Sequence, residues 1–174
     1  KLRRAKESAR ADILSSEEAR RGVILSLVSS IATGYINLRD LDRQLEIAQT
    51  TVKTREESYD IIKLRFTGGI VSELELSQVK SQYEEALATL PVIGKSIALQ
   101  ENALSVLLGR NPGPIPRGKT IDQLILPPVP AGLPSDLLGR RPDIRQAEQN
   151  LISANAQIGV AKAQYFPSIS LTGL

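Results

Sequence analysis

The sequence predicts an all-α protein: an elongated antiparallel coiled-coil hairpin, followed by a third helix in series with the returning helix. Apolar residues recur every three or four positions over most of the 174-residue chain, which is the period of packed helices. A glycine pair interrupts this period at residues 68–69, and a proline-rich stretch interrupts it again after Gly109. Aromatic residues make up only 3% of the chain, which suits narrow helical seams.

The first helix is expected over about 60 residues, from Ala5 to Phe66. Its apolar seam advances by threes and fours, with Arg55 as the one polar member, through Ile24, Val28, Ile31, Tyr35, Leu38, Leu41, Leu45, Ala48, Val52, Tyr59, Ile62 and Phe66. Gly22 and Gly34 lie inside this helix, and each costs about 1 kcal/mol of helix propensity relative to Ala. We interpret both as tolerated, because the period continues past them.

A specified turn is expected at residues 67–72. Glycine tolerates the positive φ that ends a helix, so Gly68 and Gly69 should stop the incoming helix. Ser72 and Glu75 have the spacing of a capping box, and Val71 and Leu76 occupy hydrophobic-staple positions. The second helix is then expected over residues 72–108, with a kink at Pro91, where the ring clashes with the preceding turn. Residues 1–108 are thus predicted to form one long hairpin.

Residues 109–141 are predicted to form an ordered proline-rich strap with one short helix or strand, packed down by apolar residues at 121 and 124–126. A third helix is expected from Pro142, because proline and an acidic first turn favour a helix start. Its seam comprises Ile144, Ala147, Leu151, Ala154, Ile158, Ala161 and Tyr165. Small residues at 153, 156, 159 and 163 would let neighbouring helices approach closely. Residues 168–174 alternate polar and apolar residues, as at the start of a β-strand.

The composition excludes several kinds of chemistry. The chain has no Cys, His, Met or Trp, which removes thiol nucleophiles, disulfides, Cys/His metal sites and histidine-based triads. Adjacent carboxylates such as Glu56 and Glu57 lie about 100° apart on a helix and face solvent. No glycine-rich phosphate loop follows a strand. We therefore predict that the protein is not an enzyme and has no catalytic residues, cofactor or metal site.

Positive charge is concentrated at the start of the chain. The first ten residues hold five Lys or Arg residues and one Glu, whereas the whole chain carries a net charge of +3. We interpret these residues as a solvated helix face and not as a nucleic-acid or membrane patch, because no aromatic platform or basic groove motif accompanies them. No apolar run of transmembrane length is recognised, and the abrupt chain ends suggest a piece of a larger protein.

Three motifs in the last third of the chain are specific. They are Leu-Pro-Ser-Asp-Leu-Leu-Gly-Arg-Arg-Pro-Asp-Ile at residues 133–144, Ala-Asn-Ala-Gln-Ile-Gly-Val-Ala at 154–161, and Tyr-Phe-Pro-Ser-Ile-Ser-Leu-Thr-Gly at 165–173. Together with Gly-Ile-Val-Ser-Glu-Leu at 69–74, Glu-Asn-Ala-Leu at 101–104 and Leu-Leu-Gly at 107–109, they closely resemble the TolC/OprM-like outer-membrane factors of tripartite efflux pumps. The resemblance covers essentially the whole chain.

The resemblance implies a function. In that family a homotrimer joins a β-barrel in the outer membrane to a helical tunnel in the periplasm of a Gram-negative cell. This chain would be one periplasmic tunnel section: the hairpin 1–108, an equatorial strap 109–141, and a third helix with the start of a membrane strand at 142–174. The section would be a passive duct, so selectivity for drugs or metal ions is expected in the inner-membrane transporter, and no nucleic-acid partner is expected.

The resemblance also implies site residues. The turn would dock with a periplasmic adaptor, the membrane fusion protein that links the channel to the transporter, through Thr67, Gly68, Gly69, Ile70, Val71 and Ser72. Glu75 matches the acidic position near the closed end of the family's tunnel, and it is equally well explained as half of the capping box. Two alternatives remain open, an adaptor hairpin and a coiled-coil scaffold. The strap and third helix favour the channel, since an adaptor hairpin should instead be flanked by lipoyl-like β segments.

Overall fold

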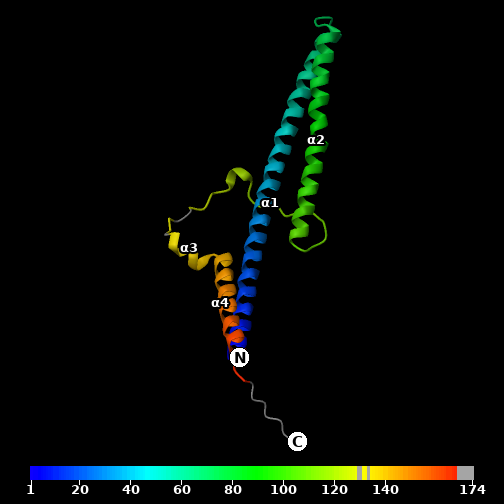
Figure 1. The fold of residues 1–174 in the computed structure, drawn as a ribbon. Coiled ribbons are helices and arrows are strands. Elements are labelled where there is room, and N and C mark those ends of the chain that lie inside the picture. Colours follow the sequence, from blue (N-terminus) through cyan, green and yellow to red (C-terminus); the bar gives the residue numbers. More distant parts are fainter. Residues whose placement is uncertain (129–130, 133, 168–174) are drawn as a thin grey trace. The chain divides into compact units, whose positions relative to one another are not determined.

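The computed structural model describes residues 1–128, 131–132 and 134–167, and these residues are helical with connecting loops (Figure 1). The elements in chain order are α1 (Leu2–Thr67), α2 (Glu73–Leu107), η1 (Ile121–Gln123), α3 (Pro134–Arg140), α4 (Pro142–Lys162) and η2 (Ala163–Tyr165). No strand occurs in this part of the chain, and the all-α prediction is confirmed. The strand start expected at residues 168–174 lies outside the described residues.

The chain divides into two compact units. The first unit comprises Lys1–Val28 with Pro127–Leu174, and the second comprises Ser29–Leu126. Helix α1 contributes its beginning to the first unit and its remainder to the second. The second unit holds the hairpin of α1 and α2, and the first holds α3 and α4 packed with the start of α1.

In the second unit, the heptad seam packs as the sequence predicts. Leu38 of α1, Leu104 of α2 and Ile115 of the strap form a buried core. Three partly buried residues complete this core: Ile31, Tyr35 and Ile97. The apolar α1 seam residues from Leu41 to Ile62 are half-buried, as are their α2 counterparts from Leu76 to Ile97, whereas Arg55 is exposed. Helix α2 runs unbroken through Pro91.

Gly34 is required by this packing and is not merely tolerated. A Cβ atom at position 34 would lie 2.9 Å from Leu104 Cδ2 and 3.0 Å from Gln100 Nε2, closer than real Cβ contacts allow. The Gln100 amide also donates a 2.9 Å hydrogen bond to the Gly34 carbonyl. The interpretation drawn from periodicity was therefore incomplete, because helix propensity does not report how closely a second helix approaches.

The strap packs down, but its residue in the buried core is not one of those that the sequence singled out, of which Ile121 alone is half-buried. Ile115 is the strap residue in the core, whereas Ile125 and Leu126 are almost fully exposed. The short helix η1 begins after Thr120, which forms a capping box with Gln123. Helix α3 supplies a second helical segment within the predicted strap. Hydrophobicity alone does not distinguish these residues, since Ile115 is selected by the groove between Leu38 and Leu104.

In the first unit, α4 packs against α1 through its small residues. Ser8 and Ser153 share a buried 2.9 Å hydrogen bond, and the Ser15 hydroxyl donates a 2.7 Å bond to the Asn150 side chain. Ala156 is buried in the same interface. The predicted heptad seam of α4 faces elsewhere: Leu151, Ile158 and Tyr165 are more than half exposed. The prediction that α4 packs through its heptad seam was therefore wrong. Helix α4 contacts α1 through its small residues instead, because small side chains let the two helices approach closely.

A buried ion pair accompanies this interface. The Glu18 side chain is 8% exposed, and its Oε1 atom lies 2.7 Å from an Arg21 nitrogen and 3.0 Å from an Arg145 nitrogen. Two cations therefore compensate one buried carboxylate, which lowers the cost of removing it from water. Arg145 comes from α4, so the pair also connects the two helices.

One segment of α1 meets the length and composition of a membrane-crossing helix. The helix contains an 18-residue window with mean hydropathy 1.2, of which 11% is buried. No charged residue occurs between Arg21 and Arg39, and Val23, Leu25 and Val28 in this stretch are exposed. The expectation that no apolar run reaches this length was therefore wrong, because the heptad analysis counted only one face of the helix.

Candidate docking site at the hairpin turn

The turn between α1 and α2 closes α1 with a Schellman motif. The Ile70 N–H donates a 2.9 Å hydrogen bond to the Arg65 carbonyl, and the Gly69 N–H donates one of 2.9 Å to the Phe66 carbonyl. Gly69 has a φ of +73°, the left-handed conformation that this motif needs and that glycine adopts without strain. Of the two predicted glycines, Gly69 is therefore the one that reverses the chain.

Helix α2 starts at a formed cap. Ser72 has extended backbone angles, and its hydroxyl accepts a hydrogen bond from the Glu75 N–H at 3.3 Å. Within the described residues, the Glu75 carboxylate makes no return bond to the Ser72 N–H, so half of the predicted capping box is present. Glu73 and Glu75 lie in the first turn, where negative charge is favourable for the helix dipole.

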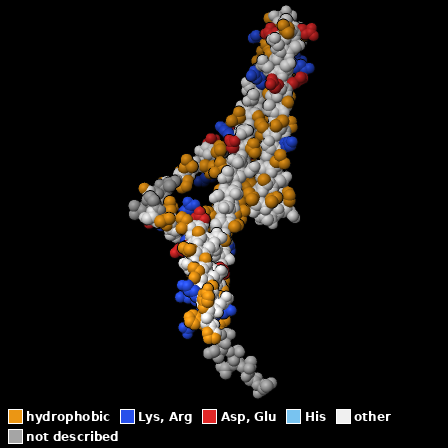
Figure 2. Space-filling view, in the orientation of Figure 1, with side chains coloured by type: hydrophobic (Ala, Val, Ile, Leu, Met, Phe, Trp, Pro, Cys, Tyr) orange, Lys and Arg blue, Asp and Glu red, His pale blue; other side chains and the backbone are white. Residues whose placement is uncertain are grey.

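The Schellman motif and the Ser72 cap thus fix the backbone of the turn, and the turn carries exposed apolar side chains. Ile70 is 76% exposed, and Leu64 and Leu74 beside it are also largely exposed. The space-filling view shows basic and acidic side chains around the turn end of the hairpin (Figure 2). An apolar tip surrounded by charge is suited to contact another protein.

A cluster of cross-hairpin contacts lies a few turns from the tip. The Tyr59 and Tyr83 rings stack with centroids 6.0 Å apart at an interplanar angle of 7°, and the Lys63 ammonium lies 5.7 Å from the Tyr59 centroid. Arg55 donates a 2.8 Å hydrogen bond to Gln82. Partial burial, followed by the nearby Glu56 carboxylate, raises the pKa of Tyr83. These contacts join α1 to α2, so the distal part of the hairpin is braced.

A charged network holds the strap to the hairpin in the second unit. Arg117 of the strap donates bonds of 3.1 and 3.2 Å to the two oxygens of Asp42 on α1, and it pairs with Glu101 on α2. Glu101 also accepts a 3.1 Å bond from the Ile115 N–H. One strap side chain therefore contacts both helices.

Two further bonds extend this network along α1. The Arg39 side chain donates a 3.0 Å bond to the Lys119 carbonyl and a 2.6 Å bond to Asp42, and the Tyr35 hydroxyl accepts a 2.8 Å bond from the Gly118 N–H. The hydrogen bond from Arg117, together with that from the Ile115 N–H, outweighs partial burial and lowers the pKa of Glu101. Glu101 is therefore ionised at neutral pH.

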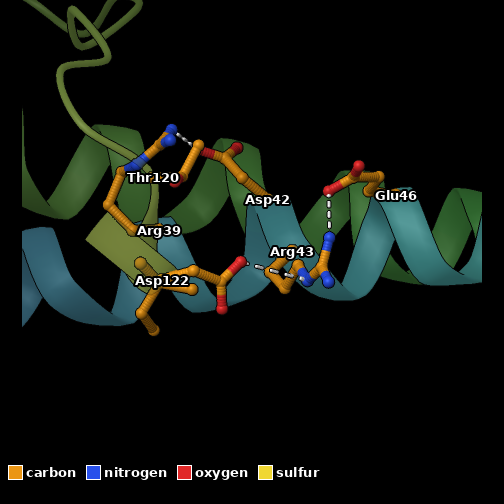
Figure 3. A pocket seen from close by; sticks show the side chains of 7 residues that line it. Arg39, Asp42, Arg43, Glu46, Thr120 and Asp122 are labelled. Atoms are coloured by element: carbon orange, nitrogen blue, oxygen red, sulfur yellow. Dashed lines mark hydrogen bonds and ion pairs between the residues drawn. The ribbon is translucent and has the colours of Figure 1, made fainter. Parts of the chain in front are cut away.

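Beside the network lies a small hollow lined by charged side chains (Figure 3). In it, Arg43 pairs with Glu46 at 2.7 Å and with Asp122 at 3.8 Å, and Arg39 pairs with Asp42. Each basic group that lines the hollow thus has an acidic partner among the described residues. This arrangement braces η1 against α1 and offers no uncompensated charge to a ligand.

The sequence analysis found the tip residues but missed the charged network. Thr67 through Ser72 and Glu75 lie together at one end of the hairpin, as predicted, and all but the half-buried Val71 are exposed. One signal in the sequence could have indicated this network. Arg117 is the basic residue between Pro116 and Gly118, in a strap otherwise dominated by proline and apolar residues. Its two partners are 75 and 16 residues away in the chain, so only the folded chain joins them.

Comparison with known proteins decides which kind of hairpin this is. A family model described as outer membrane efflux protein matches residues 1–110 and 133–174. The chain belongs to the outer membrane efflux protein family. The resemblance found in the sequence is thereby confirmed, and it favours the channel prediction over an adaptor hairpin or a coiled-coil scaffold. The family is one of efflux channels and not of enzymes.

Individual members of the efflux protein family match almost the whole chain. The chain is 40% identical over 173 residues to the probable efflux pump outer membrane protein TtgC of Pseudomonas putida, covering 99% of this chain and 36% of TtgC. It is 38% identical over 174 residues to the cation efflux system protein CusC of Escherichia coli K12, covering 99% of this chain and 38% of CusC.

A solved CusC structure, studied for its folding and transmembrane channel formation, superposes with a TM-score of 0.84 at 36% identity. The match covers 95% of this chain and 39% of that one. The chain thus spans somewhat more than a third of the length of the relatives it matches.

Proposed function

We propose that this chain is the periplasmic tunnel section of an outer-membrane efflux channel in a Gram-negative bacterium, and that it acts as a passive exit duct. Membership of the outer membrane efflux protein family carries the proposal. On this proposal, residues 1–108 are the tunnel hairpin, 109–141 the equatorial strap, and 142–174 the third helix with the start of a membrane strand. The full-length protein is a homotrimer anchored in the outer membrane.

The packing of the helices supports a wall-forming role. In the first unit, α4 leaves Leu151, Ile158 and Tyr165 exposed although they have heptad spacing, and a seam of this kind is built to pack against another helix. Helix α1 also carries exposed apolar residues at positions 23–28, which are likewise available to pack against another helix. Neighbouring tunnel helices would cover both surfaces in an assembled channel.

The hairpin tip is the proposed docking site for a periplasmic adaptor, which connects the channel to an inner-membrane transporter. The contact set is Thr67, Gly68, Gly69, Ile70, Val71 and Ser72. The Schellman motif and the Ser72 cap hold this backbone in one conformation, so little conformational entropy is lost on binding. Exposed Ile70 supplies the apolar anchor.

Glu75 is the proposed constriction residue of the tunnel. Its N–H is bound by the Ser72 hydroxyl, whereas its carboxylate is exposed. In a homotrimer, three such carboxylates at the narrow end would form an acidic ring, which favours cations over anions. The helix-capping and constriction roles are compatible, because the backbone serves the first and the side chain serves the second.

The docking proposal is tested with Ile70→Asp in the full-length protein that contains this chain. We expect the recovery of adaptor in cross-linked complexes to fall on the order of tenfold, because a buried anchor is replaced by a charge. Export of the pump substrate should fall with it. Trimer formation in the outer membrane, followed on a non-denaturing gel, should remain.

Ile125→Asp is the matched control, because Ile125 is 88% exposed and also belongs to the second unit, but lies in the strap. This variant should retain adaptor recovery and export. Equal adaptor recovery with Ile70→Asp and with the unchanged protein would exclude the tip as the docking site. Loss of the trimer in both variants would overturn the assignment of these surfaces.

A further inference from the structure

A hollow opens in the first unit where α3 leads into α4, which lies beside the first part of α1 (Figure 1). Its volume is about 420 Å³, within the range of about 300–1,000 Å³ that is common for small-molecule sites. We call it the α3–α4 hollow, and its lining consists of Arg21, Ile24, Leu25, Val28, Arg140 and Pro142. These residues combine an apolar surface with two cations, and no acidic residue is among them.

The floor of the α3–α4 hollow is one apolar face of α1. Ile24, Leu25 and Val28 share this face, because they are spaced by one, three and four positions, and all three are exposed. Gly22 faces α4 instead, since a Cβ atom there would lie 4.0 Å from the Pro142 Cβ. The contact between α1 and α4 therefore leaves the apolar floor uncovered.

A different face of α1 is available to a neighbouring tunnel helix. Val23 and Leu27 are four positions apart and exposed. With about 3.6 residues per turn, they lie about 110–150° around the helix from the middle of the floor. A helix that packs on Val23 and Leu27 therefore leaves the α3–α4 hollow open.

Arg140 supplies one cation beside this floor. It is the last residue of α3, it is exposed, and it forms no ion pair within the part of the chain that the structure describes. Asp136 lies one turn earlier on α3 and is not paired with it. The next residue, Arg141, is instead paired with Asp143 at 2.5 Å. Arg140 is therefore available to bind an external anion.

Arg21 supplies the second cation. Its side chain is 54% exposed, and one of its nitrogens lies 2.7 Å from Glu18 Oε1. The same oxygen lies 3.0 Å from an Arg145 nitrogen, so one carboxylate is shared by two guanidinium groups. Because a guanidinium has several N–H donors, Arg21 retains donors for a ligand in the hollow.

We propose that the α3–α4 hollow binds a small amphiphilic organic anion. Its apolar chain or ring would lie on Ile24, Leu25 and Val28, and its acid group would bind Arg140, with Arg21 as the second cation. Guanidinium groups bind carboxylates through charge-assisted, often paired hydrogen bonds, and the apolar floor adds affinity by burying the hydrocarbon part. The inference goes beyond the proposed channel function, and it depends neither on docking at the tip nor on a trimer.

An amphiphilic anion fits this lining better than other occupants. An organic cation would meet two guanidinium groups and no acidic side chain of the lining. A wholly apolar helix face would remove Arg140 from water without a counter-charge, which is costly. An amphiphilic anion satisfies both the floor and the cations.

The test follows the binding of decanoate to the chain by NMR of the isoleucine, leucine and valine methyl groups. Decanol and decyltrimethylammonium, the neutral and cationic comparisons, are used like decanoate below the concentrations at which they form micelles. Decanoate should shift the methyl signals of Ile24, Leu25 and Val28 saturably, and should leave those of Val23 unchanged. The affinity for decyltrimethylammonium should be lower on the order of tenfold or more, because it lacks the acid group.

Arg140→Gln should lower the affinity for decanoate on the order of tenfold and leave that for decanol unchanged, because only the ion pair is lost. Arg20→Gln is the matched control. Arg20 is exposed on α1 in the same unit, forms no ion pair among the described residues, and does not line the hollow. This variant should retain the affinity for decanoate.

A second pair of variants tests the floor. Val28→Asp should lower the affinity for decanoate on the order of tenfold or more, because it places a like charge on the apolar surface. Val23→Asp introduces the same group on the other face of α1 and should retain binding. Circular dichroism confirms that all variants are folded.

Three results would overturn the proposal. Equal affinity for decanoate and decanol, or equal loss in Arg140→Gln and Arg20→Gln, would remove the role of the guanidinium groups. Shifts spread evenly over exposed methyl groups, including Val23, would indicate unspecific adsorption. Shifts at Ile24, Leu25 and Val28 that depend on chain concentration and persist in decanoate would assign this face to a second copy of the chain.

Discussion

At the scale of single residues, Glu101 shows how one side chain stabilises a loop without any regular structure. It accepts bonds from Arg117 and from the Ile115 N–H, and Ile115 belongs to the buried core. The carboxylate therefore positions both the charged and the apolar anchor of the strap. Arg117 contributes to the same network through Asp42.

We predict that Glu101→Gln lowers the free energy of unfolding at neutral pH by about 1–3 kcal/mol, because a charge-assisted hydrogen bond is lost. The folded state lowers the pKa of Glu101. This stabilisation is therefore fully present above the usual glutamate pKa of about 4.3 and is lost as the pH falls through the folded-state value. Urea unfolding at several pH values should show the difference disappearing in acid.

Glu57→Gln provides the comparison for that experiment, because Glu57 is exposed on α1 in the same unit and has no ion pair among the described residues. It should change the unfolding free energy little at any pH. A difference between Glu101→Gln and the unchanged chain that persisted undiminished in acid would show that packing, and not the carboxylate charge, is responsible.

At the scale of elements, both helices of the hairpin end in the same way. Gly69 after α1 and Gly109 after α2 have φ values of +73° and +65°. In each case the next N–H reaches back five residues to form the longer bond of a Schellman motif, Ile70 to Arg65 and Arg110 to Ser105. These motifs determine where the chain leaves each helix, and hence where the turn and the strap begin.

Gly69→Ala and Gly94→Ala make the same chemical change with opposite expected effects. No atom lies within 4 Å of a Cβ built at either position, so packing does not contribute. Gly69→Ala should destabilise the chain by about 1–2 kcal/mol, the cost of a left-handed residue with a Cβ. Gly94 lies inside α2, and its replacement should stabilise the chain by up to about 1 kcal/mol.

Thermal unfolding of the two variants followed by circular dichroism measures both effects. Hydrogen exchange at Ile70 provides a local readout, because its N–H closes the Schellman motif and should exchange faster in Gly69→Ala. If both variants shifted stability in the same direction, the turn would not depend on the left-handed conformation of Gly69.

At the scale of the whole molecule, the proposed trimer would bring three copies of Glu75 together, one from each subunit. We predict that Glu75→Gln in the full-length channel lowers the cation-to-anion permeability ratio several-fold in planar bilayers, because an acidic ring at a constriction controls ion selectivity. Glu73→Gln is the matched control. Glu73 is also exposed in the first turn of α2, but it lies about 200° around the helix from Glu75.

Glu73→Gln should leave the permeability ratio unchanged. If Glu75→Gln also left it unchanged, the carboxylate would not line the narrow part of the tunnel, and its exposed position in α2 would reflect only the favourable charge at a helix start. A reduced ratio in both variants would mean that the overall charge of the tip determines selectivity.

The long helices, their ends and the family follow from the sequence alone. Local periodicity and turn residues decide where a helix begins and ends, so the caps at Ser72 and after Thr67 were predictable. The match to the outer membrane efflux proteins was predictable from the motifs of residues 133–173. Both rest on information that is contiguous in the chain.

Which helix faces meet depends on the tertiary structure. It places Gly34 against Leu104 and packs α4 through Ser153 and Ala156 instead of its heptad seam. It also joins Arg117 to Asp42, and it brings Arg145 of α4 to Glu18 of α1. The physical reason is common to all four. Each depends on the close approach of segments far apart in the chain, and that distance is set by the shapes of both surfaces, which periodicity along one helix does not contain.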